Sequence, residues 1–178
     1  DIQAAWLGQW SGGGMIGQIM LQLARISGAS SVALIEISEA KRKVAATLGT
    51  ELCIDPTTQD VKEVLNRNGM ERISSVIECV GKPSTIDLAI EIAGKKSIVM
   101  MFGLTKPDET VTIKPFEIFQ KEIEIKASFI NPYTQQRALN LIDSGVLQLK
   151  PVIYKIAGLD DLAEILGNPS LRANGKYV

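Results

Sequence analysis

Short apolar runs alternate with amphipathic stretches along the first hundred residues of this 178-residue chain. Residues 31–37 (SVALIEI) form a continuous apolar run, typical of a parallel strand buried on both faces. In residues 15–26 the apolar positions recur every three or four residues, which predicts an amphipathic helix. The pattern predicts strands at residues 4–7, 31–37, 51–54, 74–80 and 96–102, and helices at residues 15–26, 38–49, 60–66 and 84–93. Strand–helix repeats with short connections predict a doubly wound α/β fold, a parallel sheet with helices on both faces and strand order 3-2-1-4-5-6.

The pattern changes after Gly103. Residues 110–114 and 122–129 alternate apolar and polar positions, so we expect strands with one exposed face. A helix at 132–144, a strand at 151–156 and a helix at 160–166 complete the prediction. Because no apolar run reaches about 18 residues and no signal peptide opens the sequence, we expect one cytoplasmic domain covering residues 1–178.

Composition excludes several classes of site. Hydrophobic residues make up 46% of the chain and charged residues 22%, which is ordinary for a globular domain. A formal net charge of −1 disfavours a broad nucleic-acid-binding face. The chain contains 2 cysteines and no histidine, which removes His-activated nucleophiles, the imidazole general base and nearly all zinc sites. Composition therefore leaves no histidine-based catalytic pair and almost no basis for a zinc site.

A glycine motif, G-x-G-x-x-G, lies between the first predicted strand and the first helix. It consists of Gly12, Gly14 and Gly17. The first glycine permits a tight turn, the second lets the backbone approach a pyrophosphate, and the third lets the helix pack on the strand. The amides that open the helix at Met15, with the positive end of its dipole, favour phosphate. The motif predicts a dinucleotide site.

An acid ends the strand that follows the motif. Glu36 comes about 20 residues after Gly17, the position from which a carboxylate accepts hydrogen bonds from the adenosine ribose. A carboxylate repels a 2′-phosphate, so we expect NAD to be preferred over NADP. Lys41 and Arg42 lie nearby, and such cations can hold a 2′-phosphate. Two other readings stay open: a class I methyltransferase, which also combines a glycine loop with an acid, and a stand-alone NAD-sensing module that changes partner or oligomer without a reaction.

Several further blocks carry a family resemblance. GGGMIG is followed by VALIEISEAKRKVAATLGTELCIDP, then by VIECVGKPSTIDLAIEIAGKKSIVMMFG and by FQKEIEIKASF. From Gly12 to Val178 the chain resembles the coenzyme-binding domain of the medium-chain, zinc-type alcohol and polyol dehydrogenases, the sorbitol, threonine and butanediol dehydrogenase group. The resemblance implies a Rossmann fold that binds NAD. The parent enzyme would oxidise a secondary alcohol or polyol by hydride transfer to the nicotinamide.

The resemblance also implies roles by position. Gly12, Gly14 and Gly17 would cradle the pyrophosphate at the Met15 helix start, and Ile16 would press on the nicotinamide ring. Glu36 and Lys41 would bind the adenosine ribose. Val80 and Gly81 would close the fourth strand beside the coenzyme. Backbone groups around Phe102, Leu104 and Phe129 would hold the carboxamide.

Two departures from the family pattern matter. The family's zinc ligands, proton relay and most of its substrate pocket lie in a separate, mainly upstream domain, so we expect the isolated chain not to turn over an alcohol. Cys53 and Cys79 are expected to pack rather than bind zinc. Residues 8–11 intervene before the glycine motif and place Trp10 where a ligand would approach. Residues 110–114 and 122–129 fall where the family pairs edge strands, which implies a homodimer.

Overall fold

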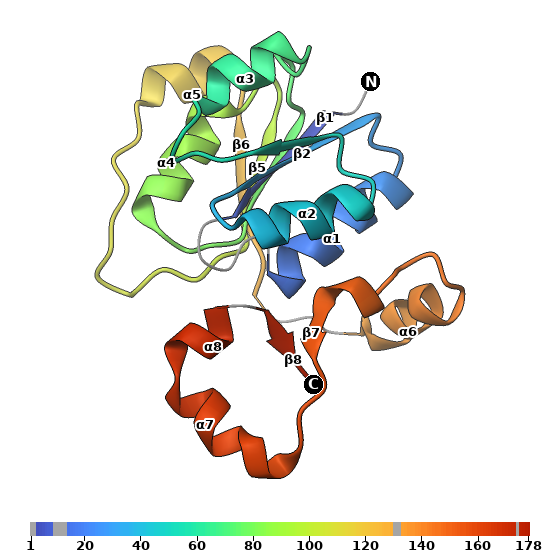
Figure 1. Cartoon of the computed structure of the whole chain (residues 1–178). Coiled ribbons are helices and arrows are strands. Elements are labelled where there is room, and N and C mark those ends of the chain that lie inside the picture. Colours follow the sequence, from blue (N-terminus) through green and yellow to red (C-terminus); the bar gives the residue numbers. More distant parts are fainter. Residues whose placement is uncertain (1–2, 9–13, 130–132, 174) are drawn as a thin grey trace.

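The computed structural model describes residues 3–8, 14–129, 133–173 and 175–178. Its main element is a six-stranded parallel sheet with helices on both faces (Figure 1). The strands are β1 Gln3–Gly8, β2 Ser31–Glu36, β3 Leu52–Ile54, β4 Ser75–Glu78, β5 Ile98–Met101 and β6 Glu124–Ala127. Their order is β3-β2-β1-β4-β5-β6, so the predicted doubly wound fold and its strand order are confirmed.

Strand β2 shows why both faces of the sheet are covered. Val32 and Leu34 pack on one side with α1 (Met15–Ile26) and α2 (Glu39–Thr47). Ala33 and Ile35 pack on the other side with α3 (Val61–Arg67) and α4 (Pro83–Ile92). Each fully buried Leu or Ile side chain stabilises the fold by about 2 kcal/mol. A continuous apolar strand is therefore what this position requires.

The helices begin and end where local chemistry permits. The Asp60 side chain accepts a 2.8 Å hydrogen bond from the backbone N–H of Glu63 and so caps α3. Pro83 opens α4, a position where its missing N–H costs nothing. Gly28 follows α1 with φ of +92°, the left-handed conformation that glycine adopts without strain.

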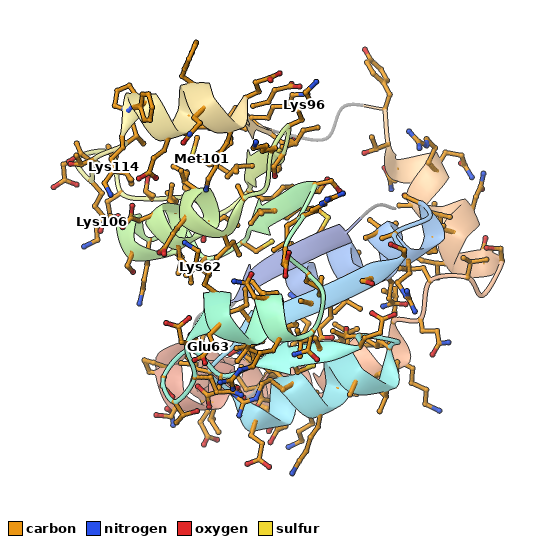
Figure 2. The ribbon with its side chains drawn as sticks, turned by 90° about the horizontal axis from the view of Figure 1, so that it is seen from above. Lys62, Glu63, Lys96, Met101, Lys106 and Lys114 are labelled. Carbon is orange, nitrogen blue, oxygen red and sulfur yellow. The ribbon has the colours of Figure 1, made fainter. Side chains whose placement is uncertain are left out.

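The segment between β5 and β6 differs from the prediction. Residues 110–114 form no strand, and α5 (Pro115–Lys121) follows them, opened by Pro115. Val111 packs against the core while Ile113 is exposed, so the alternation comes from a loop lying on the core. The strand expected at 122–129 is confirmed as the shorter β6, parallel to β5. Seen from above, Met101 of β5 lies within the molecule and Lys106 and Lys114 at its margin (Figure 2).

The C-terminal part lies beside the sheet, below it in Figure 1. It comprises α6 Gln135–Asp143, η1 Lys150–Val152, β7 Ile153–Lys155, η2 Leu159–Asp161, α7 Leu162–Gly167, α8 Pro169–Ala173 and β8 Lys176–Tyr177. The elements α8 and β8 were not predicted. Two hydrogen bonds tie this part to α1: Gln22 Nε2 donates to the carbonyl of Gln148 (3.0 Å), and the Gln148 N–H donates to Gln22 Oε1 (2.8 Å). Among the described helices, none has the length and apolar character needed to cross a membrane.

Candidate functional site

The start of α1 offers backbone N–H groups at the carboxyl edge of the sheet. Gly14 precedes the helix in an extended conformation and has no side chain that could cap it. The 12-residue helix directs the positive end of its dipole to this point. Met15 is partly buried, Ile16 is 40% exposed, and Gly17 is buried within α1. Of the predicted insertion, Gly8 is the last residue of β1 and is paired with Glu36 of β2. Gly12 and the rest of the insertion, including Trp10, lie outside the described residues.

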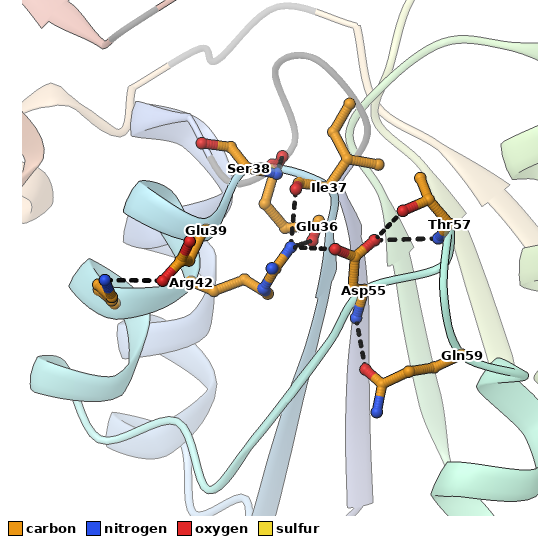
Figure 3. Close-up of polar contacts among 9 residues, drawn as sticks. Glu36, Ile37, Ser38, Glu39, Arg42, Asp55, Thr57 and Gln59 are labelled. Atoms are coloured by element: carbon orange, nitrogen blue, oxygen red, sulfur yellow. Dashed lines mark hydrogen bonds and ion pairs between the residues drawn. The ribbon is translucent and has the colours of Figure 1, made fainter.

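Glu36 ends β2 at the same edge and is fully buried. Its Oε1 accepts a 2.8 Å hydrogen bond from the backbone N–H of Ser38, the residue that precedes α2 (Figure 3). Lys41, in the first turns of α2, is also buried, and its carbonyl accepts a 2.9 Å hydrogen bond from Gln18 Nε2. The starts of α1 and α2 are therefore joined directly beside Glu36.

One cavity of about 360 Å³ adjoins both helix starts. Gly14, Met15 and Gln18 line it at the start of α1, and Ser38 and Lys41 line it at the start of α2. The C-terminal part closes it with Pro151, Val152, Tyr154, Gly175 and Lys176. Of the predicted residues, the cavity brings together Gly14, Met15 and Lys41. Such a cavity beside the N–H groups of two helix starts can accept an anionic, extended ligand.

A second buried acid, Glu78, holds the loop after β4. Its Oε1 accepts hydrogen bonds from the N–H groups of Val80 (2.7 Å) and Gly81 (2.9 Å) and from Thr85 Oγ1 (2.8 Å). Its carbonyl accepts from the N–H groups of Phe102 and Gly103, both at 2.8 Å. Glu78 thus joins the ends of β4 and β5. Sequence reasoning missed it, although an acid inside an apolar strand is a usable signal.

The loops after β4 and β5 meet backbone to backbone. Gly81 has a φ of +75°, and a Cβ there would lie 2.3 Å from the carbonyl oxygen of Leu104. A Cβ on Gly103 would lie 2.1 Å from the nitrogen of Gly81. Only glycine fits at either position, so the two loops form one surface at the carboxyl edge of the sheet.

The remaining predicted residues lie along this edge but outside the cavity. Val80 and Phe102 are partly buried at the ends of β4 and β5. Leu104 is 91% exposed and Phe129, just after β6, is 88% exposed. The structure thus places these side chains at the ends of three successive strands, separate from the α1–α2 cavity.

The described residues do not fit a zinc site. Nowhere among them do three Cys, Asp or Glu side chains gather as a metal would require. Burial raises the pKa of the Cys79 thiol to about 12, and the Glu78 charge adds to this. Burial also raises the pKa of Cys53. Both cysteines are protonated packing residues at neutral pH.

Residues 15–144 match the family model described as zinc-binding dehydrogenase. The chain belongs to the zinc-binding dehydrogenase family. The resemblance to medium-chain zinc-type alcohol and polyol dehydrogenases is thereby confirmed, and the match covers α1 through α6.

Relatives in this zinc-binding dehydrogenase family align over most of the chain. Galactitol 1-phosphate 5-dehydrogenase of Escherichia coli K12 is 30% identical over 166 residues, covering 86% of this chain and 46% of that protein. L-threonine 3-dehydrogenase of Thermococcus kodakarensis is 27% identical over 172 residues, covering 94% of this chain and 49% of that protein. The chain spans about half the length of the curated relatives it matches.

Solved structures of dehydrogenases share the fold of this chain. A protein assigned as a zinc-binding dehydrogenase from Sinorhizobium meliloti 1021, solved bound to NADP, superposes with a TM-score of 0.90 at 30% identity, covering 99% of this chain and 51% of that one. The 2R,3R-butanediol dehydrogenase of Bacillus subtilis superposes with a TM-score of 0.84 at 23% identity, covering 98% of this chain and 49% of that one. The second likeness supports the fold alone.

Proposed function

We propose that this chain is the coenzyme-binding domain of an NAD-dependent alcohol or polyol dehydrogenase. The observation that carries the proposal is that the start of α1, where Gly14 provides no side-chain cap, and the buried Glu36 at the next strand end lie at the same edge of the sheet. The dehydrogenase relatives and the NADP-bound relative support the same ligand class. When bound, the nicotinamide ring supplies the hydride acceptor.

Different residues along the carboxyl edge of the sheet would bind different parts of the coenzyme. The N–H groups at Gly14 and Met15 would bind the pyrophosphate, together with Gly12 and Gly17 of the motif. Glu36 and Lys41 would hold the adenosine ribose. Ile16, Val80, Gly81, Phe102, Leu104 and Phe129 would form the nicotinamide end. This division assigns adenosine to the β2 end of the sheet and the reacting ring to the ends of β4 to β6.

The zinc chemistry of the family belongs, in this proposal, to another domain. Because the described residues gather no set of metal ligands, residues 1–178 would supply binding and ring orientation rather than alcohol activation. The alcohol is a substrate of the whole enzyme. We name no catalytic residue within this chain.

A homodimer through β6 also belongs to the proposal. All residues of β6 are exposed and Ile125 lies on this edge strand. The adjoining α5 exposes Phe116 and Phe119. An open parallel edge beside exposed aromatic side chains favours pairing with a second copy.

Fluorescence titration of the chain with NADH tests the coenzyme assignment. We expect saturable binding, weakened about tenfold by Glu36→Gln, because the charged acceptor for the ribose hydroxyls is lost. Glu39→Gln is the matched control: this acid lies three residues away but is exposed and paired with Lys43 at 2.7 Å, so affinity should stay unchanged. Absence of saturable binding by the unmodified chain would refute the proposal. If NADH binding changes the oligomeric state but the whole protein oxidises no alcohol, the alternative of a stand-alone NAD-sensing module is favoured.

A further inference from the structure

Two acidic residues lie side by side where β2 and β3 end, at the edge proposed to bind adenosine. Ile35 of β2 is paired with Ile54 of β3, so the next residues, Glu36 and Asp55, emerge together at the carboxyl edge. Arg42 of α2 reaches back between them (Figure 3). Its side chain and that of Asp55 are each only 18% exposed. The arginine is therefore largely shielded from solvent and is held at the end of β2 by the Glu36 carbonyl.

A single nitrogen of Arg42 makes three contacts that fix its position. Nη1 donates to the carbonyls of Glu36 (2.6 Å) and Ile37 (2.7 Å) and pairs with Asp55 Oδ2 at 3.1 Å. The two carbonyls neutralise no charge, whereas the carboxylate does. Asp55 is thus the ionised partner of a guanidinium that already stands beside Glu36.

Asp55 is itself held in place. Its Oδ1 accepts hydrogen bonds from the N–H (3.0 Å) and hydroxyl (2.6 Å) of Thr57, and its N–H donates to Gln59 Oε1 at 2.9 Å. The Thr57 hydrogen bonds, aided by the Arg42 charge, hold the pKa of Asp55 below its usual range. The carboxylate is therefore charged at neutral pH, and its geometry does not depend on Arg42 alone.

We propose that Asp55 is a specificity-determining residue that suppresses NADP binding by neutralising Arg42. This inference rests on the proposed function. A guanidinium close to the start of a helix is a favourable place for a phosphate, because the charge and the helix dipole act together. With Asp55 present, the charge of Arg42 is already paired with a carboxylate, so the guanidinium offers a 2′-phosphate little net attraction. Of the two cations near the proposed ribose site, Lys41 and Arg42, Arg42 is thus occupied by Asp55.

Loss of the Asp55 charge should leave Arg42 without an ionised partner. Asp55→Asn preserves the size of the side chain and an acceptor for Thr57. The two carbonyl contacts keep Arg42 beside the ribose, now without a carboxylate partner. We expect NADP affinity to rise by about tenfold and NAD affinity to change little, because only NADP carries the extra charge.

Calorimetric titration of the chain with NAD and with NADP tests the proposal. The variants are Asp55→Asn, Arg42→Gln and the two combined, with Glu39→Gln as the control that removes a nearby negative charge without releasing Arg42. The gain in NADP affinity should appear in Asp55→Asn, vanish in the double variant, and be absent in Glu39→Gln. Thermal unfolding of each variant checks that the fold is intact.

The possible results distinguish a failure of the Asp55 specificity role from a failure of the coenzyme assignment. If the unmodified chain binds NAD but Asp55→Asn leaves the NADP affinity unchanged, the specificity role is wrong and the coenzyme assignment stands. An equal gain in the double variant would also overturn it, because the effect would not pass through Arg42. If neither nucleotide binds the unmodified chain, the proposed function fails and this inference fails with it.

Discussion

At the scale of single residues, buried ionisable side chains distinguish the carboxyl edge of the sheet. Glu36 and Glu78 are both fully buried, one at the end of β2 and the other at the end of β4. Neither is an ordinary core residue, because burying a carboxylate is costly unless hydrogen bonds compensate. Each acid receives backbone N–H donors from the loop that follows its strand. The chain thus uses acids to fix the loops at its site.

The two thiols should differ in reactivity. The pKa of Cys79 is raised to about 12, so at pH 8 about one part in ten thousand is thiolate, the reactive form. Iodoacetamide should therefore modify Cys79 far more slowly than Cys53, where the Arg42 charge partly offsets burial. Peptide mass spectrometry after timed alkylation measures both rates. In urea the rates should become equal; a fast Cys79 reaction in the folded chain would contradict its burial.

At the scale of elements, Glu78 is the residue that joins two loops. Glu78→Gln replaces a charged acceptor with an amide that cannot satisfy the same donors, so the free energy of unfolding should fall by about 2 kcal/mol. Amide exchange at Val80 and Gly81 should accelerate. Urea unfolding and hydrogen exchange measure these effects. The control is Glu91→Gln, which alters an exposed acid 3.7 Å from Lys62 and should change the free energy of unfolding by less than about 0.5 kcal/mol. An equal loss of stability in both variants would show that Glu78 does not join the two loops.

The sequence predicts elements well where a single pattern decides them. The continuous apolar run of β2 has to be buried on both faces, and the structure buries it from Val32 to Glu36. The alternation at residues 110–114 misleads, because a loop that lies along a core gives the same pattern as a strand. The contact between Arg42 and Asp55 depends on the pairing of β2 with β3, which no local pattern contains. Site residues within one segment can be predicted from the sequence. Contacts between residues of different segments become visible only once the fold is known.

At the scale of the whole molecule, the exposed β6 edge leads to a prediction about assembly. Sedimentation across the micromolar range should show a dimer. Ile125→Lys should shift it to monomer by placing a charge on the edge strand. Ile156→Lys, which alters a residue already 80% exposed after β7, should leave the dimer intact. A monomer at every concentration of the unmodified chain would exclude pairing through this edge.

The reciprocal contact between Gln22 and Gln148 has a consequence for how this chain can vary. Helix α1 contributes an amide side chain, whereas the C-terminal part contributes only its peptide N–H and carbonyl. Position 148 can therefore accept many amino acids without loss of this attachment, while position 22 demands an amide of one particular length. Sequence drift at position 148 would leave both hydrogen bonds in place, whereas a single substitution at Gln22 would remove both.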